Sequence, residues 1–272
     1  MIMVPGAANF DEVMEVTNEV FFAAGDIMAT KGKLAGVADE GGWWPAFNSN
    51  EEALETLIAA IEKAGEKPGE RVVISLDIAA SEFGKDGRYR LALEDRELDS
   101  NALIEMLGGW LDHYPIASIE DPVGEDDSEG MKEFTRLYGE RVQIIGDDYL
   151  VTNAALVEEA ARQGVCNAVL VKINQAGTIT ESINAFRAAK QSGWGAIVSA
   201  RSGETEDVSI SSLSVGLGAG QLKVGSFSRS ERMAKWNECL RIQDEIGAET
   251  FVAGAPLAQT WWGAKDRTQK VG

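Results

Sequence analysis

The sequence of 272 residues contains only one histidine, His113, and two cysteines, Cys166 and Cys239. The cysteines lie far apart and neither belongs to a C-x-x-C pair, which excludes a zinc ribbon and a disulfide framework and fits a reducing compartment. One histidine cannot build a histidine-rich zinc site, so proton transfer must fall to lysine or carboxylate side chains. His113 follows a helical pattern, and we interpret it as a helix-end or loop residue without a chemical role.

Long apolar runs and an excess of basic residues are also absent. No stretch approaches about 18 uninterrupted apolar residues, and no basic region precedes an apolar one at the amino terminus, so neither a membrane span nor a signal peptide is expected. The net charge is −19, from 44 acidic and 25 basic residues, which argues against binding to nucleic acid or to a membrane surface. These properties predict a cytoplasmic protein and remain compatible with a local basic pocket for a small anion.

Apolar residues make up 44% of the chain, which is enough for a sizeable core. From Val72 onward, short apolar runs alternate with stretches whose apolar residues recur at helical spacing. The expected strands cover residues 1–5, 72–77, 116–120, 142–146, 168–172, 196–199 and 221–224. The expected helices follow the N-caps Asn9 and Ser49 and then cover about 99–112, 128–138, 153–163, 179–191, 205–218 and 229–246.

Single helices between successive strands imply right-handed crossovers and a parallel sheet, and a run of this length favours closure into a barrel. We therefore predict an α/β fold with one barrel domain over residues 1–272. A loop is expected at 36–45, a small hairpin between Gly84 and the helix that starts near 99, and an irregular tail over about 247–272.

Charged residues stand where the expected strands end. They are, in chain order, Asp77, Glu120, Asp147, Lys172, Arg201 in the turn after Ser199, and Lys223. The active face of a parallel barrel lies at the carboxyl ends of its strands, so this arrangement predicts a site. Three carboxylates suit a magnesium ion completed by water and substrate, and the basic residues suit an anionic substrate. For any single position the alternative is a structural ion pair at the barrel rim.

Two further features belong to this prediction. Lys172, with Lys223 as a cationic neighbour, is a candidate general base. Asp39 and Glu40 precede two glycines in a loop whose backbone can approach a ligand closely, although a solvated turn would have the same sequence.

Longer motifs resemble the enolase family in one register over nearly the whole chain. They cover residues 39–42, Asp77 with 80–83, 118–122, 146–148 with 151–153, 172–175, 201–207 and 229–232. The resemblance implies an enolase-type (β/α) barrel in which Asp77, Glu120 and Asp147 bind Mg²⁺. It also implies that Lys172 removes the proton next to the substrate carboxylate and that Glu40 helps the hydroxyl leave. Lys223 would hold the carboxylate, and Arg201 with Ser202 would hold the phosphate.

The chain departs from enolases in two places. Enolases carry a histidine directly before the Arg-Ser-Gly-Glu-Thr motif, where this chain has Ala200. Enolases also have an amino-terminal α+β domain and a first barrel strand before the position that matches Met1. The resemblance therefore implies a barrel that is incomplete at its amino-terminal strand, with a separate amino-terminal enolase-like polypeptide and an oligomeric assembly as partners.

Three functions are compatible with these residues. The first is an enolase-type hydro-lyase that converts 2-phosphoglycerate, a phosphorylated hydroxy acid, to phosphoenolpyruvate. The second is an enolase relative that acts on a modified phosphonate or phosphate substrate, such as a carboxyphosphonoenolpyruvate synthase. Ala200 and the pair Trp43 and Trp44 favour it, although both tryptophans could equally be packing residues. The third is a non-catalytic scaffold or binding protein, which is disfavoured because clustered like charges are costly to retain without a partner.

Overall fold

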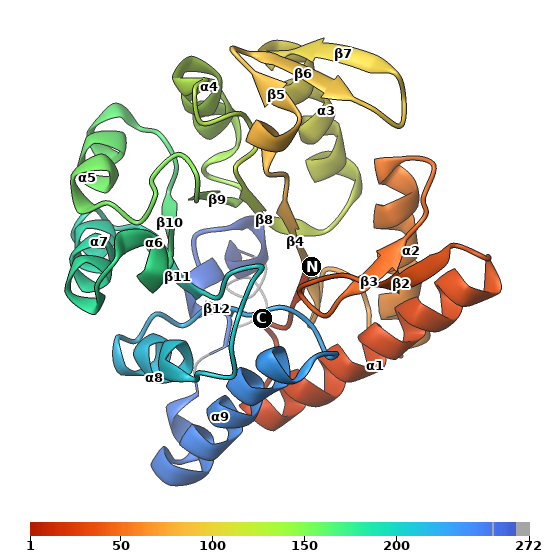
Figure 1. Ribbon diagram of the computed structural model, residues 1–272, viewed down its shortest axis with the longest axis vertical. Helices are drawn as coiled ribbons and strands as arrows, with labels where there is room; N and C mark the ends of the chain where they lie inside the picture. The colour runs from red at the N-terminus through yellow and green to blue at the C-terminus, as the bar shows by residue number, and fades with distance from the viewer. Residues whose placement is uncertain (252, 265–272) are drawn as a thin grey trace. The chain divides into compact units, whose positions relative to one another are not determined.

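The computed structural model describes residues 1–251 and 253–264, and the chain divides into two compact units. The first unit consists of Met1, Ile74–Ile197 and the segment that starts at Ala255. The second consists of Ile2–Val73 and Val198–Gly254. Figure 1 labels the α-helices and the strands β2–β12 of both units.

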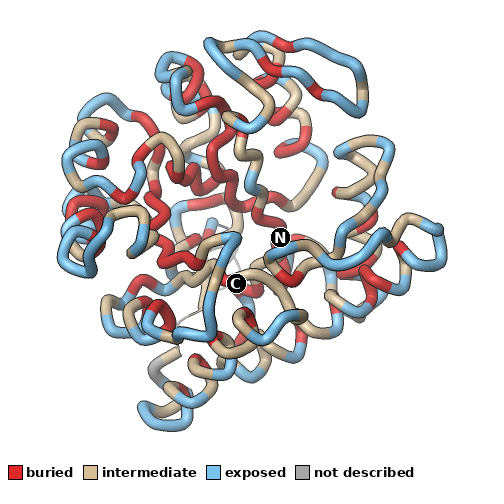
Figure 2. Tube along the Cα trace, viewed as in Figure 1, coloured by how far each residue is buried: buried red, intermediate tan, exposed pale blue. Residues whose placement is uncertain are grey.

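The first unit is built on a parallel sheet. Its neighbouring strands are, in spatial order, β4 (Val73–Asp77), β8 (Ile116–Glu120), β9 (Gln143–Gly146), β10 (Ala168–Val171) and β11 (Gly195–Ser199). The pairings from β4 through β10 are parallel, as the alternation of strands and helices predicts. Every residue of β8, β9 and β10 is buried (Figure 2). Burial on both faces is typical of a parallel sheet covered by helices.

The helices of this unit connect the strands. They are α3 (Ser100–His113), α4 (Ser128–Tyr138), α5 (Ala154–Gln163), the short α6 (Ile173–Ala176) and α7 (Ile179–Gln191). The N-cap side chains of α3, α4, α5 and α7 accept hydrogen bonds from backbone N–H groups of the first turn. His113 is exposed at the end of α3, with Nδ1 2.7 Å from the Gly109 carbonyl oxygen, which confirms the helix-end placement.

A small antiparallel sheet lies between β4 and α3 in the sequence. It contains β5 (Gly84–Lys85), β6 (Arg88–Leu91) and β7 (Arg96–Asp99), and a short 3₁₀ turn, η1 (Ala80–Glu82), precedes it. The expected hairpin is therefore present and has a third strand. Tyr89 of β6 is buried, and its hydroxyl donates to Asp127 Oδ2 over 2.8 Å and accepts from the Gly124 amide over 2.9 Å.

The second unit contains the elements at the two ends of the chain. They are β1 (Ile2–Met3), α1 (Phe10–Thr30), β2 (Leu34–Val37), β3 (Trp43–Pro45), α2 (Asn50–Lys63), α8 (Ser209–Gly216), β12 (Leu222–Lys223), α9 (Ser230–Ile246) and η2 (Ala248–Thr250). β12 pairs in parallel with Val198 and Ser199 of β11. In the strand order of the parallel sheet, β1 stands at one end and β12 at the other. Among the described residues these two strands do not pair with each other, so each is an edge strand and the sheet is open.

Local signals placed the first two helices correctly. The side chain of Asn9 accepts from the Glu12 amide at the start of α1, and that of Ser49 accepts from the Glu52 amide at the start of α2. The prediction of a loop over residues 36–45 is wrong, because β2 and β3 form an antiparallel hairpin there. Trp43 anchors it by stacking on Phe21 and donating its indole N–H to the Phe21 carbonyl oxygen over 2.7 Å.

Two other boundaries differ from the expectation. The helix expected from 205 begins only at Ser209, whose amide donates to the Asp207 carboxylate over 2.8 Å. Part of the tail expected to be irregular, Val252 and residues 265–272, lies outside the described residues. Its described part contains η3 (Ala255–Leu257), and the Trp261 indole N–H donates to the Ile116 carbonyl oxygen over 2.7 Å. No helix in the described part of the chain is both long and apolar enough to cross a membrane.

The two cysteines should resist alkylation in the folded chain. Both are buried free thiols, and burial raises the pKa of Cys166 and of Cys239, so little reactive thiolate forms. At pH 8 we expect iodoacetamide to label both residues at less than about one-tenth of the rate seen in urea, as followed by mass spectrometry. Equal rates in buffer and in urea would contradict this packing.

Candidate active site

Three acids of the first unit stand at the carboxyl ends of neighbouring strands. Asp77 of β4 is the register partner of Glu120 of β8, and Glu120 is the register partner of Ile145, two residues before Asp147. Register partners and residues two apart along a strand project toward the same side of a sheet. Asp77 and Glu120 therefore project toward the same side of the sheet edge, and Asp147 follows the end of the next strand, β9. Glu120 and Asp147 are buried, with 2% and 7% of their surface exposed.

Lys172 lies beside one of these acids. It follows β10 directly, and its Nζ forms an ion pair with Asp147 Oδ2. Both side chains are largely enclosed, with 13% and 10% of their surface exposed. The other oxygen of Asp147 accepts from Gln175 Nε2 over 3.3 Å. The structure thus places the predicted base in contact with a predicted metal ligand.

The Thr152 hydroxyl connects the loop after Asp147 to the backbone of Lys172. Thr152 Oγ1 accepts from the Lys172 amide over 3.0 Å and donates to Gln175 Oε1 over 2.6 Å. Thr152 and Val151 both have positive φ, 53° and 42°, a conformation that is unfavourable for β-branched residues and needs support from its surroundings. The contacts of Thr152 supply that support and fix Lys172 relative to the turn after Asp147.

Asp121 is an acid of the site that the sequence interpretation missed. Its Oδ1 accepts from the Asp147 amide over 3.0 Å, and its Oδ2 accepts from the Asp148 amide over 2.9 Å. Burial raises the pKa of Asp121 to about 7. The buried strand that ends in Glu120 was the signal that could have found it, because Asp121 is the next residue.

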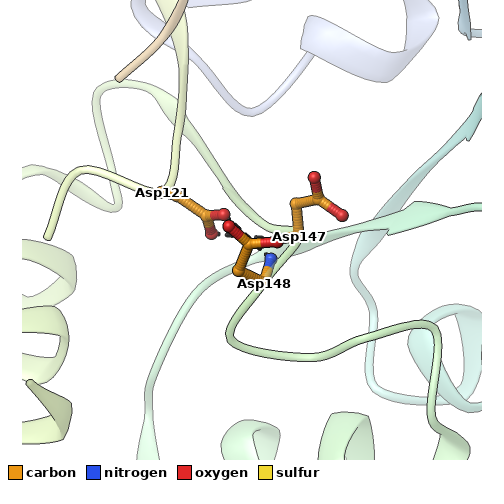
Figure 3. A group of neighbouring side chains, drawn as sticks. All are labelled: Asp121, Asp147 and Asp148. Atoms are coloured by element: carbon orange, nitrogen blue, oxygen red, sulfur yellow. Dashed lines mark hydrogen bonds between the residues drawn. The ribbon is translucent and has the colours of Figure 1, made fainter. Parts of the chain in front are cut away.

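Asp121, Asp147 and Asp148 also form a group that could hold a metal ion, with one oxygen of each within 4.8 Å of the others. Figure 3 shows Asp121 beside Asp148, whereas the carboxylate of Asp147 points away from both. Because both oxygens of Asp121 are engaged by backbone N–H groups, we interpret Asp121 as the residue that holds the Asp147 loop in place.

The remaining predicted site residues belong to the second unit. Glu40 lies in the turn between β2 and β3, and its Oε1 accepts from Ser202 Oγ over 3.1 Å. Lys223 ends β12 as the register partner of Ser199, and the Lys223 carbonyl oxygen accepts from the Ala200 amide over 2.8 Å. Arg201 is the next residue along the chain. In the second unit, the Glu40 turn is therefore joined to Ser202 by a hydrogen bond. A second hydrogen bond joins the end of β11, just before Arg201, to the end of β12 at Lys223.

Two glycines allow the Glu40 turn to approach the loop after Lys223. Gly41 has φ of 77°, and a Cβ at this position would collide with the Ser228 carbonyl oxygen. Gly225 has φ of 121°, and a Cβ there would collide with the Glu40 carbonyl oxygen. The close approach lets the Ser226 amide donate to the Glu40 carbonyl oxygen over 2.8 Å.

The two neighbouring tryptophans of β3 differ in their surroundings. Trp43 is a packing residue, because its ring stacks on Phe21 with centroids 4.4 Å apart. Trp44, its neighbour in β3, has 61% of its surface exposed.

Comparison with known proteins identifies the family. The sequence matches the family described as "Enolase, C-terminal TIM barrel domain" over residues 1–260. It is 45% identical over 248 residues to Enolase 1 of Methylococcus capsulatus, an alignment that covers 91% of this chain and 59% of that protein. The chain therefore belongs to the enolase family, and the predicted enolase-type barrel fold is confirmed. It spans about 59% of the length of this relative.

Proposed function

We propose that this chain is the barrel part of a magnesium-dependent lyase of the enolase type. The reaction would remove the proton next to the carboxylate of 2-phosphoglycerate and eliminate water to give phosphoenolpyruvate. The observation that carries the proposal is the contact between Lys172 and Asp147 at the strand ends that also carry Asp77 and Glu120. A base beside carboxylates at the carboxyl end of a parallel sheet has the groups that this chemistry needs.

The acids fit a magnesium ion. Asp77, Glu120 and Asp147 offer hard oxygen donors from three neighbouring strands, the donor type that Mg²⁺ prefers. Two of the three, Glu120 and Asp147, are buried, and Asp147 is also in contact with the cation Lys172. A bound Mg²⁺ would stabilise the negative charge that develops on the substrate carboxylate.

In the first unit, Lys172 Nζ would act in its neutral amine form, after losing the proton that it carries in the ion pair with Asp147, and would accept the proton from the carbon next to that carboxylate. The base has to stay within reach of that proton, which requires a fixed strand end. Thr152 and Gln175 supply this restraint through the Lys172 amide and the Asp147 carboxylate.

In the second unit, Glu40 would donate a proton to the departing hydroxyl. Its hydrogen bond with Ser202 supports this role, because it holds the carboxyl group in a defined position. Lys223 would hold the substrate carboxylate, and Arg201 with Ser202 would hold the phosphate. A guanidinium group suits phosphate because its parallel N–H groups match two phosphate oxygens.

We further propose that activity requires an amino-terminal enolase-like polypeptide and an oligomeric assembly. The alignment covers 59% of the Methylococcus relative, so that protein contains sequence without a counterpart in this chain, whereas the oligomeric assembly stays a prediction.

The function is tested by mixing the purified chain with its candidate amino-terminal polypeptide, Mg²⁺ and 2-phosphoglycerate. We expect the absorbance of phosphoenolpyruvate to rise, and to stop rising when EDTA removes the metal. The same mixture without the amino-terminal polypeptide is the control for the partner. No product in the complete mixture would refute the proposal.

A second candidate function rests on Ala200. This residue is buried between β11 and Arg201, where enolases carry a histidine, and its amide contacts the Lys223 carbonyl. The smaller side chain favours an enolase relative that acts on a modified phosphonate or phosphate. Turnover of a phosphonate analogue in the complete mixture, without turnover of 2-phosphoglycerate, would favour this candidate.

A further inference from the structure

The buried face of α9 begins with two cations. Arg232 and Lys235 lie in its first two turns, and each has only 1% of its surface exposed. Positive charges near the start of a helix oppose its dipole, and a buried charge is costly unless polar groups compensate it. Neither the stability of the helix nor apolar packing explains these two residues.

Arg232 binds the backbones of three loops, all within the second unit. Its Nη1 donates to the carbonyl oxygens of Arg201 over 2.7 Å and of Val224 over 2.8 Å. Its Nη2 donates to those of Ser202 over 2.6 Å and of Asp39 over 3.3 Å. A guanidinium group presents its N–H donors in fixed directions within one plane, so these carbonyl groups are held at set positions.

Each of these loops carries a residue with a role in the proposed function. Asp39 precedes Glu40, Val224 follows Lys223, and Arg201 and Ser202 are themselves the proposed phosphate ligands. Arg232 reaches these loops through their backbone carbonyl groups and not through the side chains of the proposed ligands.

Lys235 holds the far end of the loop that begins at Arg201. Its Nζ donates to the Thr205 carbonyl oxygen over 2.7 Å and forms an ion pair with Glu204 Oε2 at 3.1 Å. Glu204 Oε1 accepts in turn from the Arg201 amide over 3.0 Å. Two buried cations of α9 therefore restrain the same loop from both ends.

We propose that Arg232 is a positioning residue for binding of the phosphorylated carboxylate. It fixes the Glu40 turn, the loop that starts at Arg201 and the loop after Lys223 relative to one another, and it does not itself touch the ligand. The inference rests on the proposed function for the identity of the ligand, whereas the restraint of the loops can be measured without any ligand.

The test compares Arg232→Met, which keeps the size of the side chain but removes the donors, with Arg232→Lys, which keeps the charge and fewer donors. Arg241→Met is the matched control, because Arg241 is on the same helix, is exposed and forms an ion pair with Glu238. Hydrogen exchange followed by mass spectrometry reports on residues 39–42, 201–205 and 224–228. Calorimetry on the complete mixture reports the affinities for 2-phosphoglycerate and for Mg²⁺.

We expect Arg232→Met to speed exchange in all three loops at least about tenfold and to weaken 2-phosphoglycerate binding at least about tenfold, with an intermediate effect for Arg232→Lys. The affinity for Mg²⁺ should stay within about twofold, because the proposed metal ligands belong to the first unit. Arg241→Met should match the wild type in every measurement.

Unchanged exchange in the three loops would overturn the positioning role, and so would faster exchange spread evenly over α1 and α9, which would show a general loss of stability. If Arg232→Met does not fold, Arg232→Lys decides by the same criteria. If the wild type fails to bind 2-phosphoglycerate, the proposed function fails, and the exchange pattern alone then decides whether Arg232 restrains the loops.

Discussion

Replacement of Lys172 by methionine is expected to lower the rate of phosphoenolpyruvate formation by about 10²- to 10⁴-fold, the contribution typical of a positioned general base. Methionine fills a similar volume but cannot accept a proton. The contact of Lys172 with Asp147 and the restraint of its backbone by Thr152 explain why the lysine is placed for this role. Binding of 2-phosphoglycerate should change much less than the rate, because the proposed carboxylate and phosphate ligands are other residues.

The measurement is the steady-state rate of the complete mixture, with Lys132→Met as the control. Lys132 is an exposed residue of α4, and the control variant should keep the wild-type rate. A Lys172→Met variant that retains more than about one-tenth of the wild-type rate would exclude this lysine as the base.

Replacement of Glu120 by glutamine should remove the stabilisation that Mg²⁺ gives to the folded chain. A ligand that binds only the folded state adds about 2.7 kcal/mol to the free energy of unfolding at a concentration of 100 times its Kd. Glu120 is buried and shares the sheet edge with Asp77 and Asp147, so the loss of its charge weakens the donor set directly. We therefore expect the variant to gain almost nothing from Mg²⁺ and to form no detectable product.

Thermal unfolding of the chain with and without Mg²⁺ measures this effect. The control is Glu129→Gln, which removes the charge of an exposed acid in the first turn of α4 and should leave the Mg²⁺-dependent shift unchanged. Equal Mg²⁺-dependent shifts for the wild type and for Glu120→Gln would contradict the proposed ligand set.

The parts of the fold that the sequence predicted are those that depend on local interactions. Asn9 and Ser49 cap their helices through amides three residues away, and such contacts are visible in the sequence. The hairpin of β2 and β3 was missed because its anchor is a contact between Trp43 and Phe21, which are far apart in the sequence. The late start of α8 has a similar cause, since Lys235 binds the Thr205 carbonyl and Glu204 in the preceding loop.

In the candidate site, too, the features that depend on regular strand geometry were predicted, and those that depend on contacts between distant segments were missed. Strand periodicity predicted that Asp77, Glu120 and Asp147 meet at one edge, because register is set by the parallel sheet. Asp121 was missed because it acts through backbone amides of a loop that follows a different strand. Arg232 belongs to a motif that resembles enolases, but its carbonyl partners come from three distant loops, whose proximity the motif does not reveal.

The most direct test of the proposed chemistry is exchange of the proton next to the substrate carboxylate. The complete mixture is incubated with 2-phosphoglycerate and Mg²⁺ in D₂O, and NMR follows the signal of that proton. If Lys172 is the base, the wild type should incorporate deuterium at this carbon and Lys172→Met should not. Equal incorporation by both proteins, or none by the wild type, would contradict the proposal.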